Sequence, residues 1–423
     1  MFLAALALAA AIDAKELETL VDKTVSAEMA RQQVPGAALV LVQGGRVVLA
    51  KGYGPIAPDT IVPIASISKV FTALAVVELG IDLDRDVNQY LTSLKVPAGP
   101  TVTPKHLLTH TAGFDELPGR MTTERVQPLG EFLKTRLVRA HPPGEMTAYS
   151  SYGMTLAGLL VEDVSGLPFE RFLVHKVWAP LKMNRTQITI PEELLVHRAA
   201  AMELEGGKPV EIPWERYHST PASSISSTAN DMARFMIAML RDDRLYREQV
   251  TMHPRLPGFG YGIQYADTNG QRIVEHGGNI GGFHSLMVLL PEHDTAFFVV
   301  AHREGADLRA PVRKAILDRW FPRATPVPKP VLQGNKNMQR YAGKYRGNIW
   351  CHSCPFDPER VFDIDVKVNA DGSLQSMDER WIEVEPRFFR SADGTRRIGF
   401  AEDRNGKIIA LTAGSWLVYE RLP

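Results

Sequence analysis

A serine and a lysine stand three residues apart at the head of an apolar run, residues 66–79, whose composition is typical of a buried helix. Residues three apart on a helix lie on one face, with Cβ atoms about 5–6 Å apart. The Lys69 ammonium can therefore fold back onto the Ser66 hydroxyl. Because the rest of the run is apolar, only its first turn can present two polar groups to a cleft.

This pair suits nucleophilic catalysis without a histidine base. A serine hydroxyl is a weak nucleophile until a neighbouring group takes its proton. Desolvation beside an apolar helix and the positive helix N-terminus both lower the pKa of a lysine, which makes it a better base. About one Ser-x-x-Lys is expected by chance in a chain of this length. A serine N-cap followed by a lysine lying along the helix would give the same pattern, so other segments must decide.

Composition limits the classes of function. The chain has 423 residues, of which 45% are hydrophobic, enough for one large core or two unequal ones, and we expect two domains. Its 48 basic and 48 acidic residues give no net charge, which removes the usual electrostatic case for nucleic acid or anionic membranes as partners. A small-molecule substrate fits better. No integral membrane segment is expected, and the oligomeric state is left open.

The first 14 residues are apolar and end in small residues, like the core of a signal peptide and its cleavage site, although no basic residues precede them. We expect a signal peptide or an apolar N-terminal segment over residues 1–14. Export would place the protein in the periplasm or outside the cell, and a cytoplasmic location is the alternative.

Cys351 and Cys354 are the only cysteines and form one Cys-x-x-Cys. After export they could close a disulfide loop, and idle thiols or a redox module are the alternatives. A zinc site would need two further ligands, which no second cysteine pair supplies. We therefore expect no metal site and no cofactor.

The order of helix and strand patterns predicts an α+β domain over residues 15–321. A helix is expected at 15–31, a hairpin at 36–54, and a helical lobe inserted between about 83 and 215. Late strands and a closing helix are expected at 261–266, 272–275, 283–290, 295–301 and 306–320. Pairing of the late strands with the hairpin would give an antiparallel sheet flanked by helices, with a cleft against the lobe.

A change of composition follows this region. Prolines at positions 322, 326, 328 and 330 indicate a stiff linker, which we place at residues 322–337. Residues 338–423 then alternate in short strands, with turn signals at Asp371-Gly372 and Asn405-Gly406. We expect a small antiparallel β-barrel domain of the lipocalin-like kind, which could hold a ligand, cover the cleft or only add stability.

Further segments supply the context that the serine and lysine lack. Tyr149-Ser150-Ser151 stands in a turn just before a predicted helix, 152–165. His276-Gly277-Gly278-Asn279 follows a predicted strand, and its two glycines would allow close approach of the backbone to a ligand. Two more motifs occupy residues 107–114, which include His110, and residues 221–235.

Together these segments resemble the serine β-lactamase and penicillin-binding-protein superfamily, in the branch of class C β-lactamases, family VIII esterases and D-aminopeptidases (S12-like peptidases). The resemblance covers about residues 20–320 and rests on five motifs in the same order and spacing. It implies a β-lactamase/transpeptidase-like fold and a serine hydrolase that forms an acyl-enzyme.

The resemblance also implies roles for individual residues. Ser66 would be the nucleophile, with Lys69 and Tyr149 sharing proton transfer. His276 would form a hydrogen bond toward Tyr149 or a substrate carboxylate. The backbone N–H groups of Ser66 and Asn279 would form the oxyanion hole. The substrate would also contact Ser151, Gly277 and Gly278.

Two positions depart from the family pattern. Ser151 stands where an asparagine amide is usual, and a hydroxyl has less hydrogen-bonding capacity. His276 stands where lysine is usual in β-lactamases, and a neutral imidazole lacks the lysine's charge. We therefore expect hydrolysis of small esters, or of amides, with weak or no β-lactamase activity. The alternatives are a D-amino-acid peptidase, an amidase or β-lactamase acting on peptidoglycan-type substrates, and a non-catalytic ligand-binding homologue.

Overall fold

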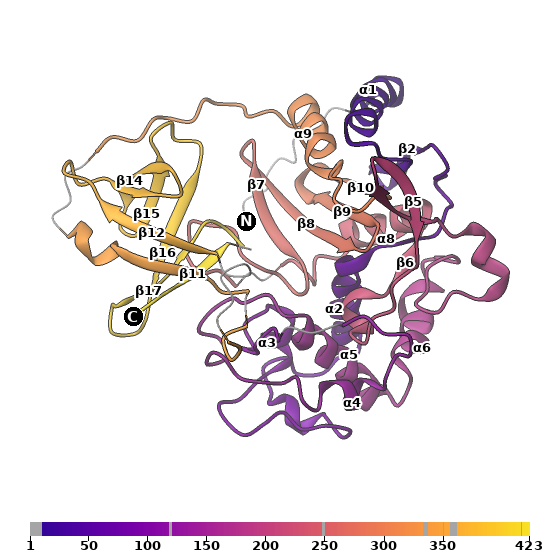
Figure 1. Ribbon diagram of the computed structural model, residues 1–423, viewed down its shortest axis with the longest axis horizontal. Coiled ribbons are helices and arrows are strands. Elements are labelled where there is room, and N and C mark those ends of the chain that lie inside the picture. Colours follow the sequence, from indigo (N-terminus) through magenta and orange to yellow (C-terminus); the bar gives the residue numbers. More distant parts are fainter. Residues whose placement is uncertain are drawn as a thin grey trace, which may run out of the picture.

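The computed structural model describes residues 11–117, 121–247, 250–332, 337–349, 351–355, 362–415 and 417–423. Most of the apolar segment 1–14 therefore lies outside the described residues. The described chain forms a central sheet with helices on both faces, a helical lobe beside it, and a barrel at one end (Figure 1). Within this part of the chain, no helix combines the length and apolarity needed to cross a bilayer.

The central sheet is antiparallel and has the strand order β2-β1-β10-β9-β8-β7. Early and late segments of the chain thus pair, as the sequence predicts. The strands are β1 (Ala37–Gln43), β2 (Arg46–Tyr53), β7 (Gln264–Thr268), β8 (Gln271–Ile280), β9 (Phe283–Leu290) and β10 (Thr295–Ala301).

Both faces of this sheet are buried, because apolar side chains on its inner strands point alternately to either side. In β1, Val40 packs toward the helical lobe and Leu39 toward the opposite face, and neither is exposed. Helices α1 (Ala14–Gln32) and α9 (Arg309–Trp320) cover the second face. Helices α2 (Ser68–Glu78) and α8 (Ala229–Arg241) lie on the lobe side (Figure 1).

Three late elements differ from the sequence prediction. Strand β7 was predicted at 261–266 but spans Gln264–Thr268. Helix α9 begins at Arg309 instead of residue 306, because the Asp307 carboxylate accepts the Arg309 N–H and holds the preceding residues in a turn. Strand β8 was predicted to end at Glu275 but continues through His276-Gly277-Gly278-Asn279 to Ile280. Its partner β9 pairs with it along that whole length, which keeps the two glycines extended.

The pairing of β8 on its other side stops earlier. Strand β7 pairs with β8 only from Gln271 to Glu275. Among the described strands, the stretch from His276 to Ile280 therefore has β9 on one side and no strand on the other. The main chain at this edge can bond a ligand instead of a neighbouring strand.

The lobe is built mainly of short helices around α5 (Ser151–Ser165), which Ser150 caps by accepting the Gly153 N–H. The others are α3 (Pro104–Leu108), α4 (Leu129–Leu133), α6 (Phe169–Leu173) and α7 (Thr220–Ser223), with single turns η1 (Ala65–Ile67), η2 (Val87–Gln89), η3 (Val174–Trp178) and η4 (Glu192–His197).

The predicted helical lobe also contains a hairpin, β4 (Ala201–Glu205) and β5 (Lys208–Ile212), which the sequence analysis did not predict. Gly206 and Gly207 both have positive φ, which is the geometry of a tight hairpin turn. A two-residue pair, β3 (Val62–Pro63) with β6 (Ser226–Ser227), joins the segment before Ser66 to the segment after α7.

The C-terminal strands form a closed eight-stranded antiparallel barrel, each strand pairing with the next and the last with the first. They are β11 (Gly343–Gly347), β12 (Asp363–Val368), β13 (Leu374–Ser376), β14 (Glu379–Glu385), β15 (Phe388–Ser391), β16 (Arg397–Glu402), β17 (Ile408–Thr412) and β18 (Val418–Arg421). Packed aromatic side chains, among them Tyr345, Phe389 and Phe400, fill its interior together with the turn η6 (Met338–Tyr341).

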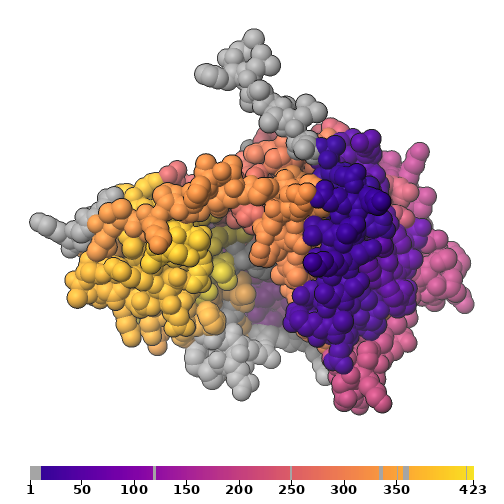
Figure 2. All heavy atoms as spheres, turned by 90° about the horizontal axis from the view of Figure 1, so that it is seen from above, coloured from indigo at the N-terminus to yellow at the C-terminus, as the bar shows by residue number. Residues whose placement is uncertain are grey.

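The barrel packs against the rest of the protein. Figure 2 shows the extended proline-rich stretch running from α9 across to the barrel. Met146 in the lobe is buried with Ala401, Ala410 and Val418 of the barrel, and the Asn348 side chain donates to the carbonyl of Thr147. The barrel therefore contacts the loop of residues 140–150, which leads into α5.

Candidate active site

Ser66 lies in the turn η1, immediately before α2. The preceding residue, Ala65, has φ +49°, in the left-handed region that residues with a side chain rarely adopt. Behind the turn, the Ser68 hydroxyl accepts the Ile225 N–H at 3.0 Å, which fixes the start of α2 against the segment after α7. This sharp turn leaves Ser66 partly exposed while Ser68 and Lys69 are fully buried.

Lys69 forms a hydrogen bond with Ser66, the predicted nucleophile. Its Nζ lies 3.1 Å from the Ser66 Oγ and donates to the carbonyl of Ala222 at 2.9 Å. Burial lowers the pKa of Lys69 to about 7, although the nearby Glu116 carboxylate acts in the opposite direction. A large fraction of Lys69 is therefore neutral near pH 7 and can accept the Ser66 proton.

Tyr149 completes a cluster around the serine. The Lys69 Nζ lies 4.8 Å from the centre of the Tyr149 ring, and the phenol forms a hydrogen bond with the Ser66 side chain. Burial raises the pKa of Tyr149 above its ordinary value. The phenol therefore keeps its proton at neutral pH and can pass it along a hydrogen-bonded path.

His110 holds the tyrosine loop from both sides. Its carbonyl accepts the Ala148 N–H at 2.8 Å and its Nδ1 accepts the Ser150 N–H at 3.2 Å. The two aromatic rings of His110 and Tyr149 are 4.5 Å apart. His110 is therefore in a position to orient Tyr149.

His276 is fully buried on β8, with its ring 6.3 Å from that of Tyr149. Its Nδ1 lies 2.7 Å from the carbonyl of Gly277, and because a carbonyl only accepts, Nδ1 carries the proton. Burial, together with the nearby Lys69, lowers the pKa of His276 to about 3. The imidazole is therefore neutral at physiological pH, as the sequence predicts for a histidine at this position.

The two glycines after His276 differ in their surroundings. A Cβ on Gly278 would lie 2.3 Å from the carbonyl oxygen of Ile64 and 3.1 Å from the Cβ of Ala65, whereas one on Gly277 would meet nothing closer than 3.6 Å. The close approach at Gly278 is thus to the turn that carries Ser66. The absence of a side chain at Gly278 lets β8 lie directly against the nucleophile turn.

The Asn279 Oδ1 accepts a hydrogen bond from His284 Nδ1, 2.8 Å away. Its main chain lies in the part of β8 that has no strand on the outer side among the described strands. An oxyanion hole formed by the N–H groups of Ser66 and Asn279 remains a prediction, with Gly277 and Gly278 beside it.

Glu116 is the site residue that sequence reasoning missed. Its carboxylate accepts the backbone N–H of Ser151 at 3.0 Å and interacts with the hydroxyls of Ser150 and Ser151. Burial raises the pKa of Glu116, and the charge on Lys69 opposes this shift. The only sequence signal was the position of two acidic residues, Asp115-Glu116, directly after the motif at residues 107–114.

Ser151 is the first residue of α5, and its N–H and hydroxyl both bond to Glu116. The sequence predicts a substrate contact at this residue. In the structure, Ser151 bonds to a buried carboxylate that interacts electrostatically with Lys69, and a substrate contact at Ser151 stays a prediction.

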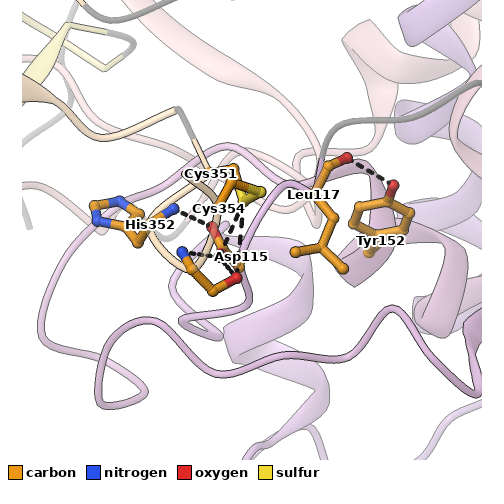
Figure 3. The surroundings of a disulfide bond; sticks show 7 residues. Asp115, Leu117, Tyr152, Cys351, His352 and Cys354 are labelled. Atoms are coloured by element: carbon orange, nitrogen blue, oxygen red, sulfur yellow. Dashed lines mark hydrogen bonds between the residues drawn. A yellow bond between two sulfur atoms is a disulfide. The ribbon is translucent and has the colours of Figure 1, made fainter. Parts of the chain in front are cut away.

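Asp115 bonds to the C-terminal part of the chain. Its carboxylate accepts the backbone N–H groups of His352 and Ser353, both at 2.8 Å, and the Ser353 hydroxyl at 2.6 Å (Figure 3). Cys351 and Cys354 form a disulfide that closes this loop. Asp115 therefore bonds to the disulfide loop, while the next residue, Glu116, interacts electrostatically with Lys69.

A cavity of about 510 Å³ lies near the same elements. Its walls include Pro63, Ser223 and Ile280, which are close in sequence to Ser66, Ala222 and Asn279 respectively. Apolar and polar side chains share the lining, with Ile188, Leu195, Trp214 and Tyr217 among them.

Known proteins share both the sequence pattern and the fold. The Beta-lactamase family model matches residues 21–319. Protein flp of Staphylococcus aureus (strain N315) is 26% identical over 313 residues, which are 67% of this chain but only 62% of that protein. A beta-lactamase of Yersinia enterocolitica is 29% identical over 243 residues, covering 54% of this chain and 61% of the relative.

Solved structures extend the likeness to nearly the whole chain. The octameric penicillin-binding protein homologue from Pyrococcus abyssi has a TM-score of 0.63 at 23% identity, over 97% of this chain and all of that one. A crystal structure of SurE has a TM-score of 0.67 at 20% identity, over 97% and 99% of the two chains. The fold is therefore shared, and the match to the family model supports a serine-hydrolase kind of function. The chain belongs to the beta-lactamase family, within the superfamily of serine β-lactamases and penicillin-binding-protein-like proteins.

Proposed function

We propose that the protein hydrolyses small esters through an acyl-enzyme on Ser66. The observation that carries this proposal is the 3.1 Å contact between Lys69 Nζ and Ser66 Oγ, in surroundings that lower the pKa of Lys69 to about 7. A general base is most effective when its pKa is close to the working pH.

In the first step, the neutral Lys69 amine takes the hydroxyl proton as Ser66 Oγ attacks the ester carbonyl carbon. The bond between that carbon and the alcohol oxygen then breaks, and the alkoxide receives the proton from the Lys69 ammonium by way of the Tyr149 phenol. The products are the free alcohol and an acyl group on Ser66.

In the second step, water attacks the acyl carbon and gives a proton to the Lys69–Tyr149 pair. The carbon–Oγ bond breaks, Ser66 recovers its proton, and the carboxylic acid leaves. In both steps the negative carbonyl oxygen would be held by the N–H groups of Ser66 and Asn279. Loss of one such donor typically costs about 10²–10³ in turnover.

Two features favour esters over β-lactams. The neutral His276 supplies no positive charge for the carboxylate that penicillins and D-alanine-terminated peptides carry. Ser151 has no amide to bond a substrate's amide group, and its hydroxyl interacts with Glu116. We therefore propose weak or no β-lactamase activity, and place the acyl chain of the ester in the 510 Å³ cavity beside Pro63 and Ile280.

We also propose a periplasmic or secreted location. The disulfide between Cys351 and Cys354 supports it, since disulfides persist in oxidising compartments.

Time-resolved mass spectrometry of the intact protein tests the reaction. Wild type and Ser66→Ala are mixed separately with p-nitrophenyl butyrate, a cephalosporin and a D-alanyl amide. We expect a transient butyryl adduct on the wild type alone, with little or no adduct from the cephalosporin. Ser26→Ala, at an exposed position of α1, is the matched control and should behave like the wild type.

Other outcomes separate the alternatives. An adduct from the D-alanyl amide that forms faster than the butyryl adduct would replace the esterase with a peptidase or amidase. A folded wild-type protein that forms no adduct with any substrate would indicate a ligand-binding homologue. Wild-type turnover by folded Ser66→Ala would refute the mechanism.

A further inference from the structure

Three side chains of the kinds that bind transition metals meet where the barrel contacts the lobe. His141 comes from the loop of residues 140–150, His352 from the disulfide loop, and Glu420 from β18. The two histidine Nε2 atoms are 3.3 Å apart, and Glu420 Oε2 lies 3.9 Å from His141 Nε2. With one ligand atom from each residue, all three atoms lie within 4.8 Å of one another.

We propose that His141, His352 and Glu420 bind a Zn²⁺ ion. In a tetrahedral site with zinc–nitrogen bonds of about 2.0–2.1 Å, neighbouring ligand atoms are about 3.3–3.4 Å apart. The distance between the two histidine nitrogens already has this value. The Glu420 Oε2 lies 3.6 Å from His352 Nδ1, so its side chain must rotate toward the two Nε2 atoms to complete the site. Two imidazoles and one carboxylate are a common ligand set for zinc, and a water molecule would take the fourth position.

Rigid supports hold two of the three ligands, His352 and Glu420, in place. Asp115 bonds the backbone N–H of His352, and the disulfide between Cys351 and Cys354 encloses that residue. Figure 3 shows the His352 ring pointing away from the disulfide and from Asp115. Glu420 pairs with Ala410 on one side and Arg346 on the other within the closed barrel. Preorganised ligands of this kind lower the cost of collecting a metal ion.

The cluster is accessible to a metal ion from solvent. Its side chains retain modest exposure, 9% for His141 and 32% for Glu420. Glu420 also lines a surface cavity of about 610 Å³, together with Glu145, Met146 and Arg340. This cavity supplies an entry path, which a metal site requires.

The three ligands are far apart in the sequence, so the spacing of cysteines and histidines along the chain does not indicate them. His141 and Glu420 are separated by most of the chain, and the two cysteines contribute a scaffold instead of ligands. A bound ion would join the barrel to the loop that carries Tyr149. The effect of the ion would be structural, because it would hold that loop in a fixed position against the barrel.

Metal binding to the full-length protein tests the proposal. The protein is stripped with a chelator, without reductant so that the disulfide stays closed, and titrated with ZnCl₂ by calorimetry. Zinc content is then measured by mass spectrometry after desalting. We expect one Zn²⁺ per chain and a higher melting temperature in its presence. His352→Ala and Glu420→Gln should each weaken binding at least about tenfold, since even outer-shell changes cost about 10–100-fold.

His175→Ala is the matched control, because His175 is exposed on another surface of the lobe. It should bind zinc like the wild type. If His352→Ala does not fold, His141→Gln provides the second ligand variant, and circular dichroism verifies its fold. Absence of zinc from the wild type, or equal affinity in the wild type and the folded ligand variants, would overturn the proposal.

Discussion

The Glu116 carboxylate accepts the backbone N–H of Ser151 at 3.0 Å, which brings an acidic group to the position where the family pattern has an asparagine. Ser151 is the first residue of α5, and Glu116 also acts electrostatically on Lys69. The negative charge favours the protonated form of Lys69, while burial favours the neutral form. The basicity of Lys69 thus depends on Glu116. In the described part of the chain, Glu116 is neither a sequence neighbour of Ser66 nor hydrogen-bonded to it.

Replacing Glu116 with glutamine should shift the pH dependence of catalysis. Lys69 must be neutral to accept a proton, so kcat/KM should rise with pH through the pKa of Lys69, about 7 in the wild type. Loss of the carboxylate removes a negative charge that stabilises the Lys69 ammonium, so the pKa of Lys69 should fall. The rising part of the pH profile of kcat/KM should therefore move to lower pH. Profiles with p-nitrophenyl butyrate measure this. Glu131→Gln, at an exposed position of α4, is the control. A shift of the profile to higher pH in Glu116→Gln would contradict the assigned effect of Glu116 on Lys69.

Replacing Tyr149 with phenylalanine should slow the reaction without unfolding the protein. The phenol that bonds Ser66 would be lost, while the ring that packs against His110 would remain. We expect kcat to fall by roughly 10²–10⁴-fold, the usual contribution of a general acid–base group. Steady-state kinetics and thermal melting measure the two effects. Tyr90→Phe, which removes a surface bond to Asp82, should leave kcat unchanged, and equal loss in both variants would exclude a specific role.

An alanine at position 278 should disturb the nucleophile turn. The added Cβ would lie 2.3 Å from the Ile64 oxygen, and overpacking of this kind costs about 1–3 kcal/mol of unfolding free energy. Because Ile64 precedes the turn that carries Ser66, kcat should fall as well. Urea denaturation and ester kinetics measure both quantities.

The control for that substitution is Gly130→Ala in α4, where the nearest atom would lie 3.7 Å from the new Cβ. In this helix, alanine should be neutral or stabilise by up to about 1 kcal/mol. Similar destabilisation at both positions would show that the contact with Ile64 is unimportant.

The neutral, buried His276 should make the folded state sensitive to acid. Its pKa is about 3 in the folded protein, below the ordinary value of 6.5, so the unfolded state binds more protons between these pH values. Its contribution to stability is therefore lost as pH falls from about 6.5 toward 3. The slope is at most about 1.4 kcal/mol per pH unit for one proton.

Urea midpoints of wild type and His276→Gln from pH 7 to pH 4 check this. The stability of the wild type relative to the variant should fall on acidification. With the exposed His175→Gln as the control, the difference should be nearly constant. A constant difference for His276→Gln would mean that His276 does not remain neutral in the folded state.

Sequence patterns predicted elements where local signals were sufficient. Strands β9 and β10 have the predicted bounds because turn residues enclose each apolar run. Strand β8 was predicted too short, since glycines in a strand usually indicate its end, and the contact of Gly278 with Ile64 cannot be read from local sequence. The pairing of Glu116 with Ser151 spans 35 residues, which no spacing rule covers.

Asn348 and Thr147 are joined across the boundary between the barrel and the lobe, two residues before Tyr149. Met146, which precedes Thr147, is covered by the barrel residues Ala401, Ala410 and Val418. A gene that ended within the proline-rich stretch would encode a protein with this apolar patch exposed to water beside its tyrosine. The barrel and the hydrolase fold are therefore expected to be inherited together, with paired substitutions at their contact, instead of being exchanged as independent modules.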